Sequence, residues 1–342
     1  MKRIAAFFVC VSCLLLCGCS WKDAGDLSAV TAGAIVHDDG QYTLTAELAI
    51  PSSADSVPDA QLVSGQADSM AQAIDNTGYG LDAQLYWSHA RVLFLDKSLL
   101  RTGIQSCIQE LTHSSEVRPA VRLCAVRNTD ADGILSCDSI SGEPVGFSLG
   151  DSISYAVQQS QTPDMPLYRV LDRIETAGMD PVLPAVSIQS GHAVLSGCAL
   201  FSGDTLQGWL DEQQTSTLSL LLAAGNTATV YHADTRYQLR NIRTNVTAQT
   251  SDSVQFTVDV DADVACETSA QAKIAATALK EQSLAVVEAL QQAGCDALGF
   301  GRAWERADAP SWRQADRDAW QEIPVTVHIT LHPVQSAEGG SR

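Results

Sequence analysis

Alternating apolar and polar residues predict strands in two parts of the chain. At residues 254–264, polar side chains separate a regular series of apolar ones, Val254, Phe256, Val258, Val260, Ala262 and Val264. A period of two residues is typical of a strand that buries one face, and we expect this strand to be of the antiparallel type. Asp259, Asp261 and Asp263 occupy intervening positions, so they are expected to face water. The same alternation at residues 42–50 predicts a second half-buried strand.

The period changes to that of an α-helix at residues 268–293. One face of this helix would carry Ala272, Ala276, Leu279, Val286, Val287 and Leu290, and Gly294 is a natural stop. Weaker patterns predict shorter helices at residues 70–76, 97–111, 166–177 and 211–223. They also predict strands at residues 90–95, 120–126 and 324–331. This mixture predicts an α+β fold with several small, mostly antiparallel sheets, each packed with helices.

The chain of 342 residues is longer than a single hydrophobic core usually supports, so several domains are expected. We expect an N-terminal region at residues 23–203 and a C-terminal domain at residues 211–333. A run rich in proline, serine and aspartate at residues 50–59 predicts an exposed loop. The last residues, 334–342, are expected to form a disordered tail.

The first 18 residues have the layout of an export signal. A basic start, Met1-Lys2-Arg3, precedes an apolar stretch at residues 4–16, and Leu16-Cys17-Gly18-Cys19 follows. The stretch is shorter than the about 20 apolar residues that span a membrane, and no charged stop-transfer segment follows it. Its Leu-x-Gly-Cys ending indicates a bacterial lipoprotein signal that is removed before Cys19, whose thiol carries a diacylglyceryl group. The alternative interpretation is an apolar leader in which the cysteines are incidental.

The charge of the chain restricts its partners. Removal of the signal takes away Lys2 and Arg3, which leaves 19 basic and 40 acidic side chains and a net charge of −21. Nucleic acids require a basic surface, and anionic lipid repels an acidic one, so neither is expected to bind this chain by charge. The membrane anchor is therefore expected to be the two acyl chains on Cys19, which suffice for stable attachment.

Six cysteines remain beyond Cys19, namely Cys107, Cys124, Cys137, Cys198, Cys266 and Cys295. An even number outside the cell permits disulfides without requiring them. The pair Cys266–Cys295 is disfavoured because the predicted helix between them, at ~1.5 Å per residue, would hold its ends roughly 40 Å apart. The sequence contains no Cys-x-x-Cys motif, so we interpret these residues as mostly buried structural thiols.

Three features of the sequence are candidate sites of chemistry. Residues 128–133 resemble the start of a calcium loop, but Ser139 stands where the motif needs a glutamate, so a polar turn is favoured. His328 and His332 share a strand face without a third metal ligand nearby, and the three aspartates at 259, 261 and 263 fit a solvated face. Neither a nucleophile elbow nor a phosphate-binding glycine loop is present. The sequence indicates no enzyme, no metal and no cofactor.

Several short motifs follow one another along the chain. They are Cys19-Ser20-Trp21-Lys22-Asp23, Leu85-Tyr86-Trp87-Ser88-His89, Asp180-Pro181-Val182-Leu183-Pro184, Gly197-Cys198-Ala199-Leu200-Phe201, Leu206-Gln207-Gly208-Trp209-Leu210 and Ala293-Gly294-Cys295-Asp296-Ala297-Leu298-Gly299-Phe300-Gly301, followed by Trp312, Trp320 and Ile323-Pro324. Taken in this order, the motifs resemble the Ger(x)C family of spore germination lipoproteins, the C subunits of nutrient germinant receptors. The tryptophans are interpreted as packing residues. His89 is interpreted as a hydrogen-bonded structural histidine.

The resemblance implies a fold of three sheet-and-helix domains, so that the N-terminal region would divide again. It also implies a non-enzymatic receptor subunit, held by lipid at Cys19 on the outer face of the spore inner membrane and assembled with two integral-membrane subunits. The transporter-like membrane subunit would be the germinant binder. The alternative is a solute-binding lipoprotein of a transporter, which predicts two lobes, a hinge and a deep cleft.

Overall fold

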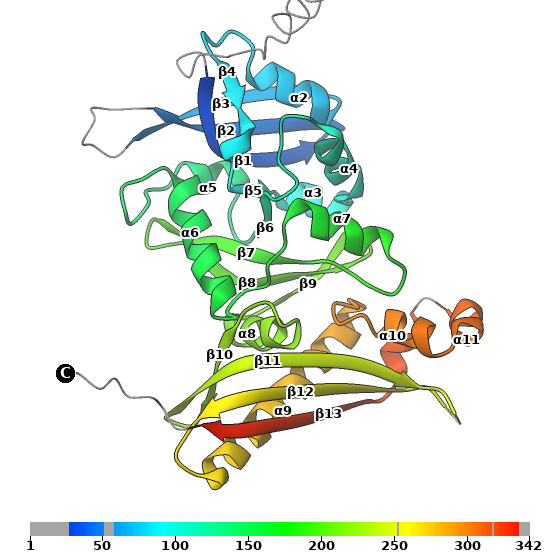
Figure 1. Ribbon diagram of the computed structural model, residues 1–342. Helices are drawn as coiled ribbons and strands as arrows, with labels where there is room; N and C mark the ends of the chain where they lie inside the picture. Colours follow the sequence, from blue (N-terminus) through cyan, green and yellow to red (C-terminus); the bar gives the residue numbers. More distant parts are fainter. Residues whose placement is uncertain (1–26, 51–57, 252, 317, 335–342) are drawn as a thin grey trace, which may run out of the picture.

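The computed structural model describes residues 27–50, 58–251, 253–316 and 318–334. Figure 1 shows two β-sheets at different heights of an elongated molecule, with helices packed on both. This arrangement confirms the α+β, multi-domain class expected from the sequence. Cys19, Trp21 and most of the loop and tail expected at 50–59 and 334–342 lie outside the described residues, so the interpretations of them stay predictions.

The larger sheet has nine strands and runs without interruption through the N-terminal region. Its main path follows the order β3-β2-β1-β5-β6-β7-β8-β9, and β4 pairs with β1. The strands are β1 (Leu27–Asp38), β2 (Gln41–Ile50), β3 (Asp59–Ala67), β4 (Gln84–Tyr86), β5 (Val92–Leu95), β6 (Arg122–Val126), β7 (Val182–Gln189), β8 (His192–Ser202) and β9 (Thr205–Leu210). One continuous sheet therefore stands where several small ones were expected.

Parallel pairing in the middle of this sheet explains its size. β1, β5, β6 and β7 are parallel neighbours, whereas the hairpins at both ends pair antiparallel. Parallel strands need crossover connections, and helices provide them here. These helices are α2 (Met70–Thr77), α3 (Lys97–Thr102), α4 (Gln105–His113), α5 (Ala131–Leu135), α6 (Val145–Gln158) and α7 (Leu167–Glu175), with a 3₁₀ turn η2 (Trp87–His89).

Both faces of the central strands are buried, which accounts for their unbroken apolar sequences. In β5, Val92 and Phe94 pack into the cluster that contains residues of α5 and α6. Leu93 and Leu95 pack on the other side, into the main core with residues of α2, α3 and α4. A strand covered on both faces shows no alternation, so the sequence signal for such strands is weak.

The second sheet has four strands in the order β10-β11-β12-β13. They are β10 (Thr227–His232), β11 (Thr235–Gln249), β12 (Gln255–Ala265) and β13 (Val325–Val334). As expected, the apolar residues of β12 are buried while its three aspartates are at least partly exposed. The expectation of an antiparallel strand holds only on one side, because β12 pairs antiparallel with β11 and parallel with β13. The helix between β12 and β13 makes this crossover.

That crossover helix is α9 (Ser269–Ala293), which confirms the long helix expected from the sequence. Thr268 and Gln271 form a capping box at its start, and Gly294 ends it at a φ of 63°. The other helices of this part are α8 (Glu212–Leu221), α10 (Phe300–Ala307), α11 (Ala309–Gln314) and the 3₁₀ turn η3 (Ala319–Glu322).

The single helix expected at residues 97–111 is in fact two helices. Gly103, at a φ of 112°, separates α3 from α4. A Cβ at this glycine would lie 2.6 Å from a carboxylate oxygen of Asp204, which accepts a hydrogen bond from the Gln105 amide at 3.3 Å. A contact with a residue about 100 positions away therefore breaks the helix. No helix within the described residues is long and apolar enough to cross a membrane.

Candidate functional site

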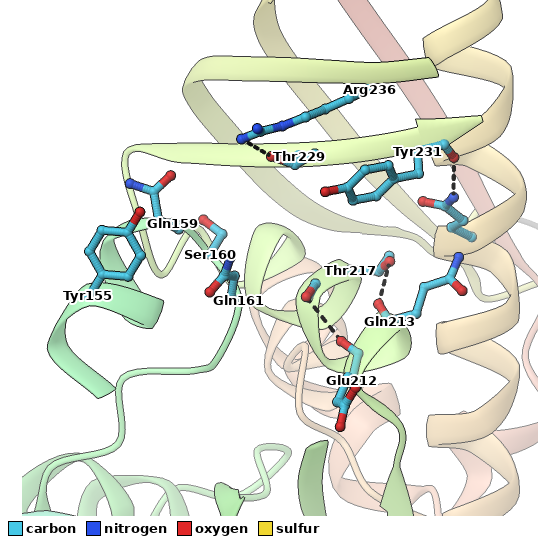
Figure 2. Close-up of a pocket in the computed structure, with 12 residues that line it drawn as sticks. Tyr155, Gln159, Ser160, Gln161, Glu212, Gln213, Thr217, Thr229, Tyr231 and Arg236 are labelled. Carbon is cyan, nitrogen blue, oxygen red and sulfur yellow. Dashed lines mark hydrogen bonds between the residues drawn. The ribbon is translucent and has the colours of Figure 1, made fainter. Parts of the chain in front are cut away.

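A cleft of about 560 Å³ lies between the end of α6 and the four-stranded sheet. Figure 2 shows its lining side chains, which come from both domains. They are Tyr155 of α6, Gln159, Ser160 and Gln161 after it, Glu212, Gln213, Ser216 and Thr217 of α8, Thr229 and Tyr231 of β10, Arg236 of β11 and Gln282 of α9. A volume of this size is in the range of small-molecule sites.

The chemistry of the cleft suits the binding of a polar molecule. Tyr155 and Tyr231 are 63% and 59% exposed. Arg236 donates from Nη2 to the Thr229 hydroxyl at 3.5 Å, and Gln282 donates from Nε2 to the Tyr231 carbonyl at 3.1 Å. The twelve lining residues include neither histidine nor cysteine, so the cleft offers no imidazole or thiol for acid–base or nucleophilic chemistry.

Ser160 marks the place where the two walls of the cleft meet. Its φ is 50°, it is 1% exposed, and its hydroxyl has no hydrogen-bond partner among the described residues. A Cβ at Gly225 would lie 2.8 Å from Ser160 Oγ and 2.3 Å from the Val157 carbonyl oxygen, so the turn after α6 packs directly on the glycine backbone. The left-handed conformation costs a non-glycine residue about 1–2 kcal/mol, and the packing at Gly225 holds it in place.

A second contact between the domains consists of two buried aspartates. Asp180 precedes β7, and Asp296 lies between α9 and α10. The Asp180 carboxylate accepts hydrogen bonds from the Gly203 and Asp296 amides, both at 2.7 Å. In return, the Asp180 amide donates to the Asp296 carbonyl at 2.9 Å. We call this set of contacts, with the side chains of Asp180, Asp296 and Arg173, the aspartate junction.

The Asp296 side chain organises the start of α10. Its two carboxylate oxygens accept from the Phe300 amide at 2.7 Å and the Gly301 amide at 2.8 Å. Burial raises the pKa of Asp296 to about 7, although the hydrogen bonds from Gly301 and Phe300 lower it. Arg173 of α7 donates to the carbonyl oxygens of Asp180 and Ala297, which adds a third element to the junction.

Close backbone approach completes the junction. Gly178 has a φ of 75°, and a Cβ there would lie 2.6 Å from backbone atoms of Gly301 and Arg302. A Cβ at Gly301 would lie 2.5 Å from Trp312 and 2.7 Å from the Cα of Gly178. The Arg302 amide donates to the Gly178 carbonyl at 3.2 Å. The two domains therefore meet through backbone contacts that side chains would prevent.

The candidate sites of chemistry from the sequence have structural roles. Asp130 caps the start of α5, where its carboxylate accepts from the Gly133 amide, so this segment is a helix start. Two histidine–aspartate pairs lie across neighbouring strands on the outer face of the small sheet. The distance from His328 Nδ1 to Asp259 Oδ1 is 3.2 Å, and that from His332 Nε2 to Asp261 Oδ2 is 2.8 Å. No group of three metal-binding side chains occurs within the described ranges.

The aromatic motifs pack largely as expected. Trp87 and Trp320 are buried, Trp209 lies under the Arg127 guanidinium at 5.3 Å, and Trp312 packs against Trp304. His89 differs from the expectation of a hydrogen-bonded structural histidine, because it is exposed. The centroid of its ring lies 5.2 Å from the centroid of the Tyr86 ring. This position at the end of a short 3₁₀ turn leaves the imidazole at the surface.

All six described cysteines are free thiols. Cys107, Cys124, Cys198 and Cys295 are buried, as the sequence led us to expect. Burial raises the pKa of Cys124 to about 12 and also raises the pKa values of the other three, which keeps these thiols protonated and unreactive at neutral pH.

The fold and its contacts define a class of protein: two sheet-and-helix domains held together by a buried aspartate junction. Residues 22–188 match the family model described as the spore germination protein N-terminal domain. Residues 196–335 match the model described as spore germination B3/GerAC like, C-terminal. The chain therefore belongs to the Ger(x)C family of spore germination proteins, as the motifs indicated.

One solved structure has the same fold along nearly the whole chain. The crystal structure of the GerBC protein covers 89% of this chain and 97% of its own, with a TM-score of 0.56 and 17% sequence identity. At this level of identity the similarity concerns the fold. No curated protein matches the chain.

Sequence reasoning did not identify the cleft. Its lining comes from five segments, and none of them carries a motif. The sequence places Asp180 and Asp296 in family motifs and indicates no role for either. The available signal was an aspartate beside Pro181 in one motif and an aspartate two residues after Gly294 in the other, because aspartates at turns often hold backbone amides.

Proposed function

We propose that this chain is the lipid-anchored subunit of a nutrient germinant receptor. Lipid on Cys19 would hold it on the outer face of the spore inner membrane, where it assembles with two integral-membrane subunits and acts without catalysis. The observation that carries the proposal is the match of both spore germination family models in succession, over residues 22–188 and 196–335.

Deletion of this chain tests the receptor role. In a strain that has a single receptor, the deletion is expected to abolish germination triggered by nutrients, while germination by a route that bypasses receptors continues. The measurement is the loss of spore refractility over time, with the restored gene as the control. Nutrient-triggered germination at the normal rate in the deletion strain would contradict the proposal.

Two cysteine substitutions test the anchor. Cys19→Ala removes the thiol that would receive the diacylglyceryl group, so labelled fatty acid should no longer enter the protein. Cys17→Ala is the matched control, because it changes the neighbouring cysteine of the same motif and leaves Cys19 in place. Its labelling is expected to remain. Equal label in the Cys19→Ala protein would show that the lipid is absent or attached elsewhere.

A second candidate function is the capture of a small solute, as in a solute-binding lipoprotein that serves a transporter. The polar and aromatic cleft favours it. The aspartate junction opposes it, because buried hydrogen bonds between the domains restrict the hinge motion that such proteins use. Melting of the full chain with amino acids and sugars tests it. A solute that raises the melting temperature of the unmodified chain, but not that of the Tyr231→Ala variant, would favour this function.

A further inference from the structure

Trp87 has a buried indole N–H that lacks a partner. The residue is 2% exposed, and its Nε1–H has no hydrogen-bond acceptor among the described residues. A Cβ at Gly33 would lie 3.2 Å from Trp87 Cζ3, so the benzene edge of the indole points into the core. Nε1 belongs to the other ring, away from that edge. A buried donor without an acceptor costs about 1–3 kcal/mol, so this N–H favours any acceptor that reaches it.

Trp87 also lines a pocket of about 370 Å³ at the end of α2. The pocket, here called the Trp87 pocket, is lined by Ile74, Asp75, Gly78, Tyr79, Gly80, Gln84, Leu85, Trp87 and Glu116. Ile74 and Leu85 form an apolar floor that is 7% and 6% exposed, whereas the Tyr79 ring at its edge is 90% exposed. A large aromatic side chain left open beside an apolar floor is typical of a protein-docking site.

The charge of the Trp87 pocket restricts the kind of partner that can bind there. Asp75 and Glu116 are the charged residues of the lining, and both are acidic. A partner segment with basic residues beside an apolar side chain would complement this surface. The Trp87 Nε1 itself is buried, so it would donate to a main-chain carbonyl of the segment only after docking shifts the indole.

The position of the Trp87 pocket favours a partner at the membrane surface. Leu27 pairs with Gln84 in the register of β1 and β4, so the pocket lies beside the first described residue. Seven residues lie between Cys19 and Leu27, so the Cα atoms of these two residues lie at most about 29 Å apart even when the segment is fully extended. Figure 1 shows β4 and α2 at the end of the molecule opposite the four-stranded sheet. A lipid on Cys19 would therefore hold the pocket near the membrane surface.

The geometry points to the Trp87 pocket as the docking site for an extracytoplasmic loop of an integral-membrane partner, a loop with an apolar residue and basic neighbours. This inference rests on the proposed receptor function and on the lipid at Cys19.

Site-specific photocrosslinking tests the inference in cells that make the lipidated full chain and its membrane partners. A benzophenone amino acid replaces Tyr79, and matched variants carry it at Tyr168 and Tyr231, which are 50% and 59% exposed. Position 79 is expected to give at least fivefold more adduct with an integral-membrane subunit than the other two positions. Mass spectrometry identifies the adduct.

Two substitutions add a quantitative measurement. Trp87→Phe keeps an aromatic ring and removes the N–H, and about three- to tenfold less membrane subunit should co-purify with it. Glu116→Lys reverses one charge at the partly exposed edge of the pocket and should also reduce recovery. This second variant keeps the test valid if Trp87→Phe lowers the melting temperature.

The possible outcomes separate the inference from the proposed function. If the unmodified chain co-purifies with membrane subunits but position 79 gives no more adduct than positions 168 and 231, the docking site is wrong and the receptor function stands. An adduct of position 79 with a soluble protein or with a second copy of the chain also overturns the docking site. If the unmodified chain recovers no membrane subunit, the proposed function fails and the inference fails with it.

Discussion

Substitution of Asp180 with alanine should weaken the contact between the two domains. The change removes the carboxylate that accepts from the amides of Gly203 and Asp296, both at 2.7 Å. A buried amide left without an acceptor costs about 1–3 kcal/mol. The Asp296 amide is buried and the Gly203 amide is only partly buried, so we expect a total loss of about 3 kcal/mol in the free energy of unfolding.

Urea denaturation followed by circular dichroism measures this loss, with every protein in a Cys19→Ala background that keeps it free of lipid. Asp172→Ala is the matched control, because Asp172 lies on the exposed side of α7 beside Arg173. A surface change of this kind should shift the free energy of unfolding by less than about 0.5 kcal/mol. If Asp180→Ala loses no more than Asp172→Ala, the two hydrogen bonds do not stabilise the junction and the reasoning is refuted.

Two further substitutions test the other half of the junction. Burial raises the pKa of Asp296 to about 7, so the unfolded carboxyl ionises near pH 4 while the folded one keeps its proton to about pH 7. The stability that this group contributes should therefore fall by roughly 2–3 kcal/mol from pH 5 to pH 7. The urea midpoint of the unmodified chain should fall between pH 5 and pH 7, whereas that of Asp296→Asn should not. An equal change of the midpoint with pH in both proteins would contradict the raised pKa of Asp296. Gly301→Ala places a Cβ 2.5 Å from Trp312 and 2.7 Å from the Cα of Gly178, so its melting temperature should drop by an amount equivalent to about 1–3 kcal/mol. An unchanged melting temperature would mean that the two backbones move apart freely.

The sequence predicted best those elements whose signal is local. The helix α9 has its own caps, with Thr268 at the start and Gly294 at the end, and the alternation of β12 is complete. The strands β1, β3, β4 and β7 to β11 were missed. β1 and β7 are largely buried and belong to the centre of the sheet, so burial on both faces removed the alternation that reveals a strand.

Features that depend on distant contacts could not be predicted from one sequence. The break between α3 and α4 depends on Asp204, and the cleft exists only because α6, α8, β10 and α9 converge. The parallel pairing of β12 with β13 brings together strands separated by the whole of α9. Local patterns contain no information on these distant contacts, and the order of family motifs indicated the class of the fold without them.

If lipid on Cys19 anchors the chain as proposed, the acidic charge and the short tether would together set the position of the protein at the membrane. A net charge of −21 would repel the body of the protein from an anionic lipid surface. At physiological ionic strength this repulsion decays over about 8 Å, and the seven residues between Cys19 and Leu27 let these two residues lie at most about 29 Å apart. The body of the proposed lipid-anchored protein could therefore stand outside the repulsive layer while the lipid stays inserted. The same limit keeps the Trp87 pocket close enough for a membrane partner to reach it, so a longer insertion after Cys19 should weaken that contact while it leaves the anchor intact.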